Sequence, residues 1–274
     1  GVHLVSEAER LAYADRDKYV ADTDFVPLPG RGVASMLDKN YLKSRSNLIN
    51  TAASMGTATA GVFDSATARF GIDNTVEYGT THFSIVDTYG NVVSMTTTVE
   101  SSMGSYHMTN GFLLTNQLTD FNSPPIGGDG NPIANRVEAG KRPRSTMAPT
   151  LVFKGTEPGD FLMATGSPGG GTIIQYVVKT VVGALDWKLN AQQATSLVDF
   201  GASNSPNTSI DTSNTTLDLG ALQDGLRLLG HGISAGAQSS GISTIMRVEK
   251  DGVMQLEGGV DPRREGIVLG NGAL

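Results

Sequence analysis

The chain has 274 residues, a formal net charge of −7 and a charged fraction of only 17%, a size between one domain and two. The negative charge excludes a basic nucleic-acid surface, and no apolar run is long enough to span a membrane. The absence of cysteine excludes disulfides and thiol catalysis and fits an oxidising compartment. No signal peptide opens the chain, so a targeting segment is expected to lie outside it.

The first third of the chain predicts two helices and a linker. Residues 6–19 predict a helix opened by a capping box at Ser6 and Glu9. Pro27 and Pro29 end this helical segment, and residues 33–48 predict a second helix. Residues 51–78 are mostly Ala, Gly, Thr and Ser, which predicts a mobile linker. The alternative is a loop that follows the surface.

The middle of the chain predicts strands. Residues 82–87 and 92–99 alternate in the manner of a hairpin, and a short strand follows at 111–114. Residues 122–143 predict a loop, and two further strands are expected at 150–153 and 160–164.

The last third mixes helices with a final hairpin. A glycine-rich turn at 166–171 precedes a long apolar helix at 172–185 and a second helix at 190–197. Residues 203–219 are polar and turn-rich, a short helix follows at 221–229, and residues 242–248 and 253–256 predict a hairpin. Consecutive hairpins favour antiparallel sheets, and the apolar helix needs a sheet to cover. The expected fold is therefore α/β, with helices outside two stacked antiparallel sheets in four layers.

The chemistry begins at Gly79 and Thr80, where the linker meets the first strand. Threonine at the start of a strand is ordinary, because it is a good strand former. A threonine hydroxyl is a weak nucleophile until a base takes its proton, and its own α-amine can be that base once the preceding peptide bond is cut. Gly79 places no side chain near that bond.

Several ordered motifs carry a resemblance to one family. They are residues 80–87 (TTHFSIVD), 90–93 (GNVV), 116–121 (NQLTDF), 141–150 (KRPRSTMAPT), 165–170 (TGSPGG) and 261–263 (DPR). Together they resemble the small subunit of γ-glutamyltranspeptidases, which are N-terminal-nucleophile hydrolases. Residues 13–16 (YADR) and 22–25 (DTDF) are similar to the end of the family's large subunit.

The resemblance implies a four-layer αββα sandwich and a division into three parts. Residues 1–50 would be the helical end of the large subunit, and 51–79 a flexible linker that ends at the autoprocessing site between Gly79 and Thr80. Residues 80–274 would form the catalytic small-subunit domain. Most of the large subunit, with the arginine that clasps the glutamyl α-carboxylate, is expected to lie outside this sequence.

The resemblance also implies catalytic roles. Thr80 would be the nucleophile with its amine as base, and the hydroxyl of Thr98 would contact it. Gly169 and Gly170 match the oxyanion-hole pair, and successive N–H groups in a glycine turn can form such an anion-binding nest. The alternatives are a strand residue that faces solvent for Thr98 and a tight turn without a ligand for the glycines.

Substrate-binding roles are implied for five further positions. Gln117 and Asp120 would hold the substrate's α-amino group, although a polar strand end is the alternative. Ser145 and Thr146 match a Ser-Ser pair that contacts the α-carboxylate. Glu100 stands where many transpeptidases carry Asn, and some relatives with Glu look more like hydrolases or act on γ-linked polymers. Arg144 replaces a commonly apolar residue, and is expected to be a solvated surface charge or to bind an acidic substrate tail.

The function implied is hydrolysis or transfer of γ-glutamyl groups from glutathione-like amides through an ester on Thr80, resolved by water or an acceptor amine. No metal or cofactor is expected, since the histidines at 3, 82, 107 and 231 show no metal-ligand spacing. The remaining large subunit is the expected heterodimer partner, in a bacterial periplasm or secreted.

Two alternatives stay open. One is a catalytically silent structural piece, and the other is a related acylase or γ-polyglutamate-type amidohydrolase. A phosphate-binding loop at 166–172 is not expected, because the segment lacks the Walker lysine and the Rossmann glycine spacing.

Overall fold

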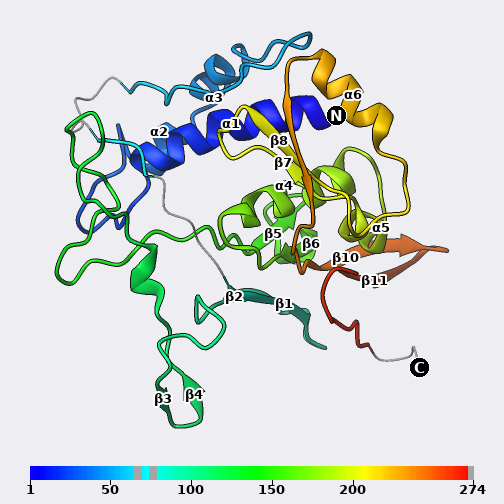
Figure 1. The fold of residues 1–274 in the computed structure, drawn as a ribbon. Helices are drawn as coiled ribbons and strands as arrows, with labels where there is room; N and C mark the ends of the chain where they lie inside the picture. The colour runs from blue at the N-terminus through cyan, green and yellow to red at the C-terminus, as the bar shows by residue number, and fades with distance from the viewer. Residues whose placement is uncertain (64–69, 74–78, 271–274) are drawn as a thin grey trace.

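The computed structural model describes residues 1–63, 70–73 and 79–270 (Figure 1). The helices are α1 (Val2–Tyr19), α2 (Val33–Met36), α3 (Lys39–Ser46), α4 (Ile173–Leu185), α5 (Ala191–Ser196) and α6 (Gly220–Leu228), with short 3-10 segments η1 (Gln117–Asp120), η2 (Pro158–Asp160) and η3 (Gly170–Thr172). The strands are β1 (Thr81–Val86), β2 (Val92–Thr97), β3 (Met108–Thr109), β4 (Phe112–Leu113), β5 (Thr150–Phe153), β6 (Phe161–Gly166), β7 (Phe200–Gly201), β8 (Asn207–Asp211), β9 (Gly232–Gly236), β10 (Ser243–Lys250) and β11 (Val253–Val260).

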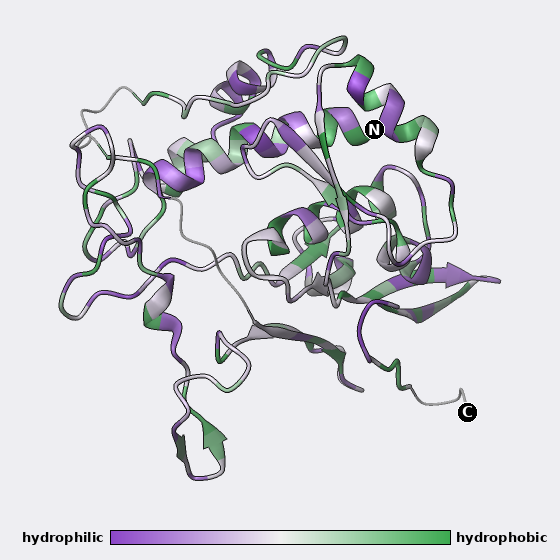
Figure 2. Ribbon diagram, viewed as in Figure 1, coloured by the Kyte–Doolittle hydropathy of each residue, from purple (hydrophilic) through white to green (hydrophobic). Residues whose placement is uncertain are grey.

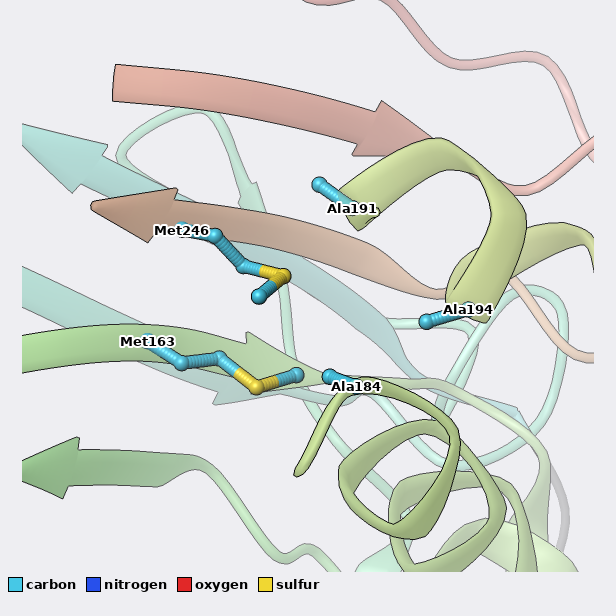
Figure 3. Packing of buried hydrophobic residues seen from close by; sticks show 5 residues of the cluster. All are labelled: Met163, Ala184, Ala191, Ala194 and Met246. Atoms are coloured by element: carbon cyan, nitrogen blue, oxygen red, sulfur yellow. The ribbon is translucent and has the colours of Figure 1, made fainter. Parts of the chain in front are cut away.

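The centre of the molecule is an antiparallel sheet in the order β11-β10-β6-β5. Helices α4 and α5 pack on one face, and the β1–β2 hairpin packs on the other against β6 and β10 (Figure 1). Met163 and Met246 of the sheet meet Ala184, Ala191 and Ala194 of the two helices in a dry cluster (Figure 3). Small alanines let the helices approach the sheet closely, and the flexible methionines fill the space left between them.

The β1–β2 hairpin forms the second sheet and leaves one face open. Its strands pair Phe83 with Met95 and Ile85 with Val93, and these four outward side chains are 38–50% exposed. Across residues 1–63, 70–73 and 79–270, no helix packs against that face. The described residues therefore supply three layers of the expected sandwich, helices, sheet and sheet.

Helix α1 crosses the molecule above α4 (Figure 1). Its first turns place Val2 and Val5 against a buried cluster of Phe200, Ile210 and Leu226. In Figure 2 hydrophilic and hydrophobic positions are mixed along the ribbon of α1. Its buried positions include the charged Glu7, Glu9 and Arg10, so the covered side of this helix is not an apolar stripe. This packing explains why the predicted start at Ser6 is wrong: the helix begins at Val2, and Ser6 is fully buried inside it.

Two other expectations are corrected. The predicted helix 33–48 is two helices, because the side chain of Asp38 accepts hydrogen bonds from the backbone N–H groups of Asn40 and Tyr41 and starts α3 there. The polar segment 203–219 contains β8, which pairs with β9 in parallel. Its short polar run gives no hydrophobic alternation, so the strand could not be recognised from the sequence.

The expected linker is described at residues 51–63 and 70–73. Backbone N–H groups of Met55 and Gly61 donate to the carboxylates of Glu7 and Asp15 on α1, at 2.8 and 2.7 Å. The N–H of Ala58 donates to Asn204 at 2.6 Å. These are the contacts of a loop that follows the surface; residues 64–69 and 74–78 of the expected linker lie outside the described residues.

A buried ionic network ties the C-terminal motif to the helical layer. The guanidinium of Arg263 lies 3.2 Å from Asp199, 2.7 Å from Asp211 and 3.0 Å from Asp261. Lys179 of α4 lies 2.8 Å from the same Asp199. Each of these side chains is at most 1% exposed, so removal of one partner would leave a charge buried without its counterion.

Glu9 on α1 predicts a pH-dependent stability. The side chain is buried, and burial raises the pKa of Glu9 to about 8. A raised carboxyl pKa means that the folded protein holds this proton more tightly than the unfolded chain. Unfolding free energy should therefore fall between pH 4.5 and 8 as the pH rises, by up to about 1.4 kcal/mol per unit. Glu9→Gln should remove this slope in urea titrations, whereas Glu249→Gln at an exposed position should retain it; equal slopes for all three proteins would contradict the assignment.

Candidate active site

Thr80 lies directly before β1, and Thr98 lies directly after β2. The last pair of the hairpin at this end joins Thr81 to Thr97. The backbone of Thr80 has φ +102°, a region that residues with a Cβ rarely adopt. The hairpin therefore places the two threonines that the resemblance pairs at the same end, each next to the Thr81–Thr97 pair.

Gly79 packs against the turn that follows β2. Its φ is +77°, and a Cβ at this position would overlap the carbonyl oxygen of Glu100. Glu100 is buried, also has a positive φ, and donates its backbone N–H to the hydroxyl oxygen of Thr98 at 2.8 Å. The peptide bond between Gly79 and Thr80 is therefore seated against Glu100, in a conformation that only glycine fits.

The start of β1 also lies beside the end of β6. The imidazole of His82 packs on Gly166, where a Cβ would overlap the ring. Burial lowers the pKa of His82 to about 4, so the ring is neutral. A cavity of about 180 Å³ between these segments is lined by residues that include Thr81, His82, Pro168 and Arg264.

The glycine turn after β6 has a backbone that only glycine adopts easily. Gly169 has φ +140° and Gly170 φ +57°, and a Cβ on Gly169 would overlap the ring of Tyr176. The turn leads through η3 into α4. Consecutive N–H groups at such a turn form a concavity with positive potential, which is the geometry an oxyanion requires.

Hydrogen bonds connect the Thr98 turn to the predicted amino-group site. The N–H of Asn116 donates to the carbonyl of Val99 at 3.3 Å, one residue before Glu100. Gln117 and Asp120 follow in η1, where Gln117 is half-buried and Asp120 is buried. A cavity of about 410 Å³ opens beside this segment, and Thr119 and Phe121 are among its lining residues.

Asn135 joins that segment to the predicted carboxylate site. It is fully buried, and its Nδ2 donates to the carbonyl of Asp120 at 2.8 Å. Its Oδ1 accepts from the backbone N–H of Arg144 at 2.9 Å, directly before Ser145. Asn135 lies in the segment expected to be a plain loop, and nothing in its sequence pattern singled it out.

One member of the predicted carboxylate pair, Thr146, contacts the glycine turn. The hydroxyl of Thr146 donates to the carbonyl of Gly170 at 2.6 Å, and the hydroxyl oxygen of Ser145 accepts from the N–H of Met147 at 3.1 Å. The predicted site residues therefore form one connected assembly, although they come from segments spread over 90 residues of the chain.

Arg144 requires a correction. It is 4% exposed and pairs with Asp17 at 3.4 Å and Asp73 at 3.2 Å. It is neither a solvated surface charge nor free to bind a substrate tail. Its buried guanidinium is the counterion of two carboxylates, and through Asp17 it links α1 to the segment that carries Ser145.

Two histidines that are far apart in sequence meet at a buried cluster with Glu7. Nδ1 of His3 lies 2.7 Å from Nε2 of His231, and the remaining ring nitrogens lie 2.8 Å from the carbonyl of Asn50 and from the hydroxyl of Thr208. Because a carbonyl only accepts, Nε2 of His3 carries the proton of its bond to Asn50. Protein hydrogen bonds thus already engage every ring nitrogen that a metal ion would need.

Known proteins resemble this chain in sequence and in structure. The family model described as gamma-glutamyltranspeptidase matches residues 1–271. The "Glutathione hydrolase proenzyme" of Bacillus subtilis (strain 168) is 37% identical over 200 residues, which cover 70% of this chain and 32% of the relative. The protein of the same name from Pseudomonas aeruginosa is 30% identical over 278 residues, 98% of this chain and 46% of the relative. The chain thus spans a third to a half of these relatives' length.

Among solved structures, the T380A mutant of Helicobacter pylori gamma-glutamyltranspeptidase matches with a TM-score of 0.57 at 30% identity, over 67% of this chain and 100% of that chain. The layered sheets with a threonine at the head of β1 are the fold of the N-terminal-nucleophile hydrolases, so the expected fold class is confirmed. Within that class, the chain belongs to the gamma-glutamyltranspeptidase family. No helix of the described residues is both long and apolar enough to cross a membrane.

Proposed function

We propose that the whole protein hydrolyses or transfers γ-glutamyl groups, with Thr80 as its nucleophile after cleavage of the bond that follows Gly79. The observation that carries the proposal is the seating of Gly79 against Glu100, with Thr80 and Thr98 at the same end of the hairpin. This arrangement singles out one peptide bond and one hydroxyl, as autoprocessing requires. Family membership supports the same chemistry.

The proposed reaction has two steps, formation of an ester on Thr80 and cleavage of that ester. The α-amine of Thr80 takes the proton of its own hydroxyl, and the oxygen attacks the γ-amide carbonyl. The N–H groups of Gly169 and Gly170 stabilise the resulting oxyanion. When the C–N bond breaks, the ammonium returns the proton to the departing amine and a γ-glutamyl ester remains on Thr80. Water or an acceptor amine then attacks the ester and regenerates the hydroxyl.

The substrate class is a glutathione-like γ-glutamyl amide. The carboxylate of Asp120 and the amide of Gln117 would hold the α-ammonium group by charge and hydrogen bonding. Ser145 would donate its hydroxyl to the α-carboxylate. Thr146 already donates its single hydroxyl proton to the carbonyl of Gly170, so it would hold the glycine turn beside that group. Glu100 is buried next to Thr98, and its resemblance to relatives with Glu at this position suggests hydrolysis or a γ-linked polymer as substrate.

The open face of the β1–β2 hairpin supports a heterodimer partner. Phe83, Ile85, Val93 and Met95 form an apolar quartet on this face, and such clusters mark surfaces that another element covers. We assign this face to the remainder of the large subunit. We also propose that the protein is located in a bacterial periplasm or is secreted, and the absence of cysteine fits such an oxidising compartment.

A pair of anilide substrates tests this function on the full-length processed protein. We expect aniline release from γ-glutamyl anilide and little from glutaryl anilide, which lacks the α-ammonium group. Intact mass should show a glutamyl adduct on the piece that begins at Thr80. Faster release from glutaryl anilide would favour the acylase alternative, and no release from either by the processed protein would favour the silent one.

A further inference from the structure

The glycine turn is held by an unusual set of donors. Each of its three consecutive carbonyl groups accepts a hydrogen bond from a side-chain hydroxyl. The pairs are Thr172 to Gly169 at 2.8 Å, Thr146 to Gly170 at 2.6 Å and Tyr13 to Gly171 at 2.6 Å. Glycines have no side chains to anchor them by packing, so these bonds set the conformation of the turn.

Tyr13 differs from the other two donors because it comes from α1, before the expected cleavage site. Its side chain is 3% exposed. Burial raises the pKa of the Tyr13 hydroxyl, so the group stays protonated and donates throughout the physiological pH range. The bond joins residues 158 positions apart, and it connects the upstream segment directly to the predicted oxyanion hole.

Two rigid peptide planes transmit the effect of Tyr13 to Gly170. A peptide unit is planar, so fixing a carbonyl also fixes the direction of the N–H on the next residue. Tyr13 fixes the carbonyl of Gly171 and thereby the N–H of Thr172. That N–H donates to the carbonyl of Gly169 at 3.3 Å, and the plane of this second carbonyl contains the N–H of Gly170.

We propose that Tyr13 is a positioning residue for the oxyanion hole. Its hydroxyl orients the Gly170 N–H toward the negative charge that develops on the substrate carbonyl, without touching the substrate. The inference rests on the proposed function. It further implies that the segment carrying α1 must stay bound after cleavage, because the piece that begins at Thr80 cannot supply this donor.

Tyr19 provides a matched control on the same helix. It is buried, and its hydroxyl donates to the carbonyl of Gly61 at 2.6 Å, away from the glycine turn. Tyr13→Phe and Tyr19→Phe therefore delete the same kind of bond, from a phenol to a glycine carbonyl. A purely structural role would affect both variants in the same way.

In the full-length processed protein, Tyr13→Phe should lower kcat for γ-glutamyl anilide by about 10- to 100-fold, with KM within about twofold, since a uniform binding loss is not expected. Tyr19→Phe should leave both within about twofold. Hydrogen exchange should be faster in a peptide covering residues 166–174 of Tyr13→Phe only. Equal kcat and equal exchange in the two variants would overturn the positioning role.

Failure of the proposed function has a different signature. A wild-type protein that is cleaved before Thr80 but acts on no γ-glutamyl amide would refute the substrate class. The exchange comparison needs no substrate, so faster exchange at 166–174 in Tyr13→Phe alone would still support the contact between α1 and the turn.

Discussion

Thr80→Ala is expected to leave the full-length precursor uncut and to lower γ-glutamyl turnover to less than about one-thousandth of the wild-type rate. Alanine has no oxygen to attack the carbonyl of Gly79 during maturation or the amide carbonyl during turnover. Because both reactions use the same atom, both should fail together. Intact mass and N-terminal sequencing report the first, and aniline release reports the second.

Two neighbouring variants control this experiment. Thr80→Ser retains the hydroxyl and should be cut and active, at lower rates. Thr81→Ala removes an equivalent hydroxyl from an exposed neighbour and should be processed normally. A Thr80→Ala protein that is cut before residue 80, or that keeps substantial activity, would rule out Thr80 as the nucleophile.

Gly79→Ala should slow self-cleavage by about 100-fold. The added Cβ would overlap the backbone carbonyl of Glu100, so the chain must shift and carry the scissile carbonyl away from the Thr80 hydroxyl. A displacement of about 1 Å is enough for a loss of this size. The time course of precursor disappearance measures it.

Gly90→Ala separates the steric clash from backbone strain. Gly90 has a similar φ, +86°, but nothing within 4 Å of an added Cβ. The Gly90→Ala protein should therefore be cleaved after Gly79 at the wild-type rate. Equal rates for Gly79→Ala and Gly90→Ala would show that the contact with Glu100 has no part in maturation. Any Gly79→Ala protein that matures should have normal turnover, because residue 79 ends the upstream piece and Thr80 is unchanged.

The position of α1 would connect the proposed maturation with the proposed catalysis. The upstream segment supplies Tyr13 to the glycine turn and Asp17 to Arg144, next to the predicted carboxylate site. Cleavage would free the amine of Thr80 while these contacts hold the two pieces together. We therefore expect the proposed reaction to need both sides of the cut bond, although the proposed nucleophile lies on only one of them.

The sequence by itself determined the local elements. Alternation predicted the β1–β2 hairpin and the apolar run predicted α4, because each depends on neighbouring residues in the chain. The cleavage point between Gly79 and Thr80 stays a prediction. The ordered motifs also identified the family that the comparisons confirm.

Only the tertiary structure decided which distant groups meet. Asn135 and Tyr13 connect the site through single side-chain bonds to backbone atoms, and Arg144 turned inward to Asp17 and Asp73. Packing of Val2 and Val5 likewise explains why α1 begins at Val2, and residues 207–211 form strand β8 because they pair in parallel with β9. Such contacts depend on the packing of segments far apart in the chain, which no local pattern of residue types encodes.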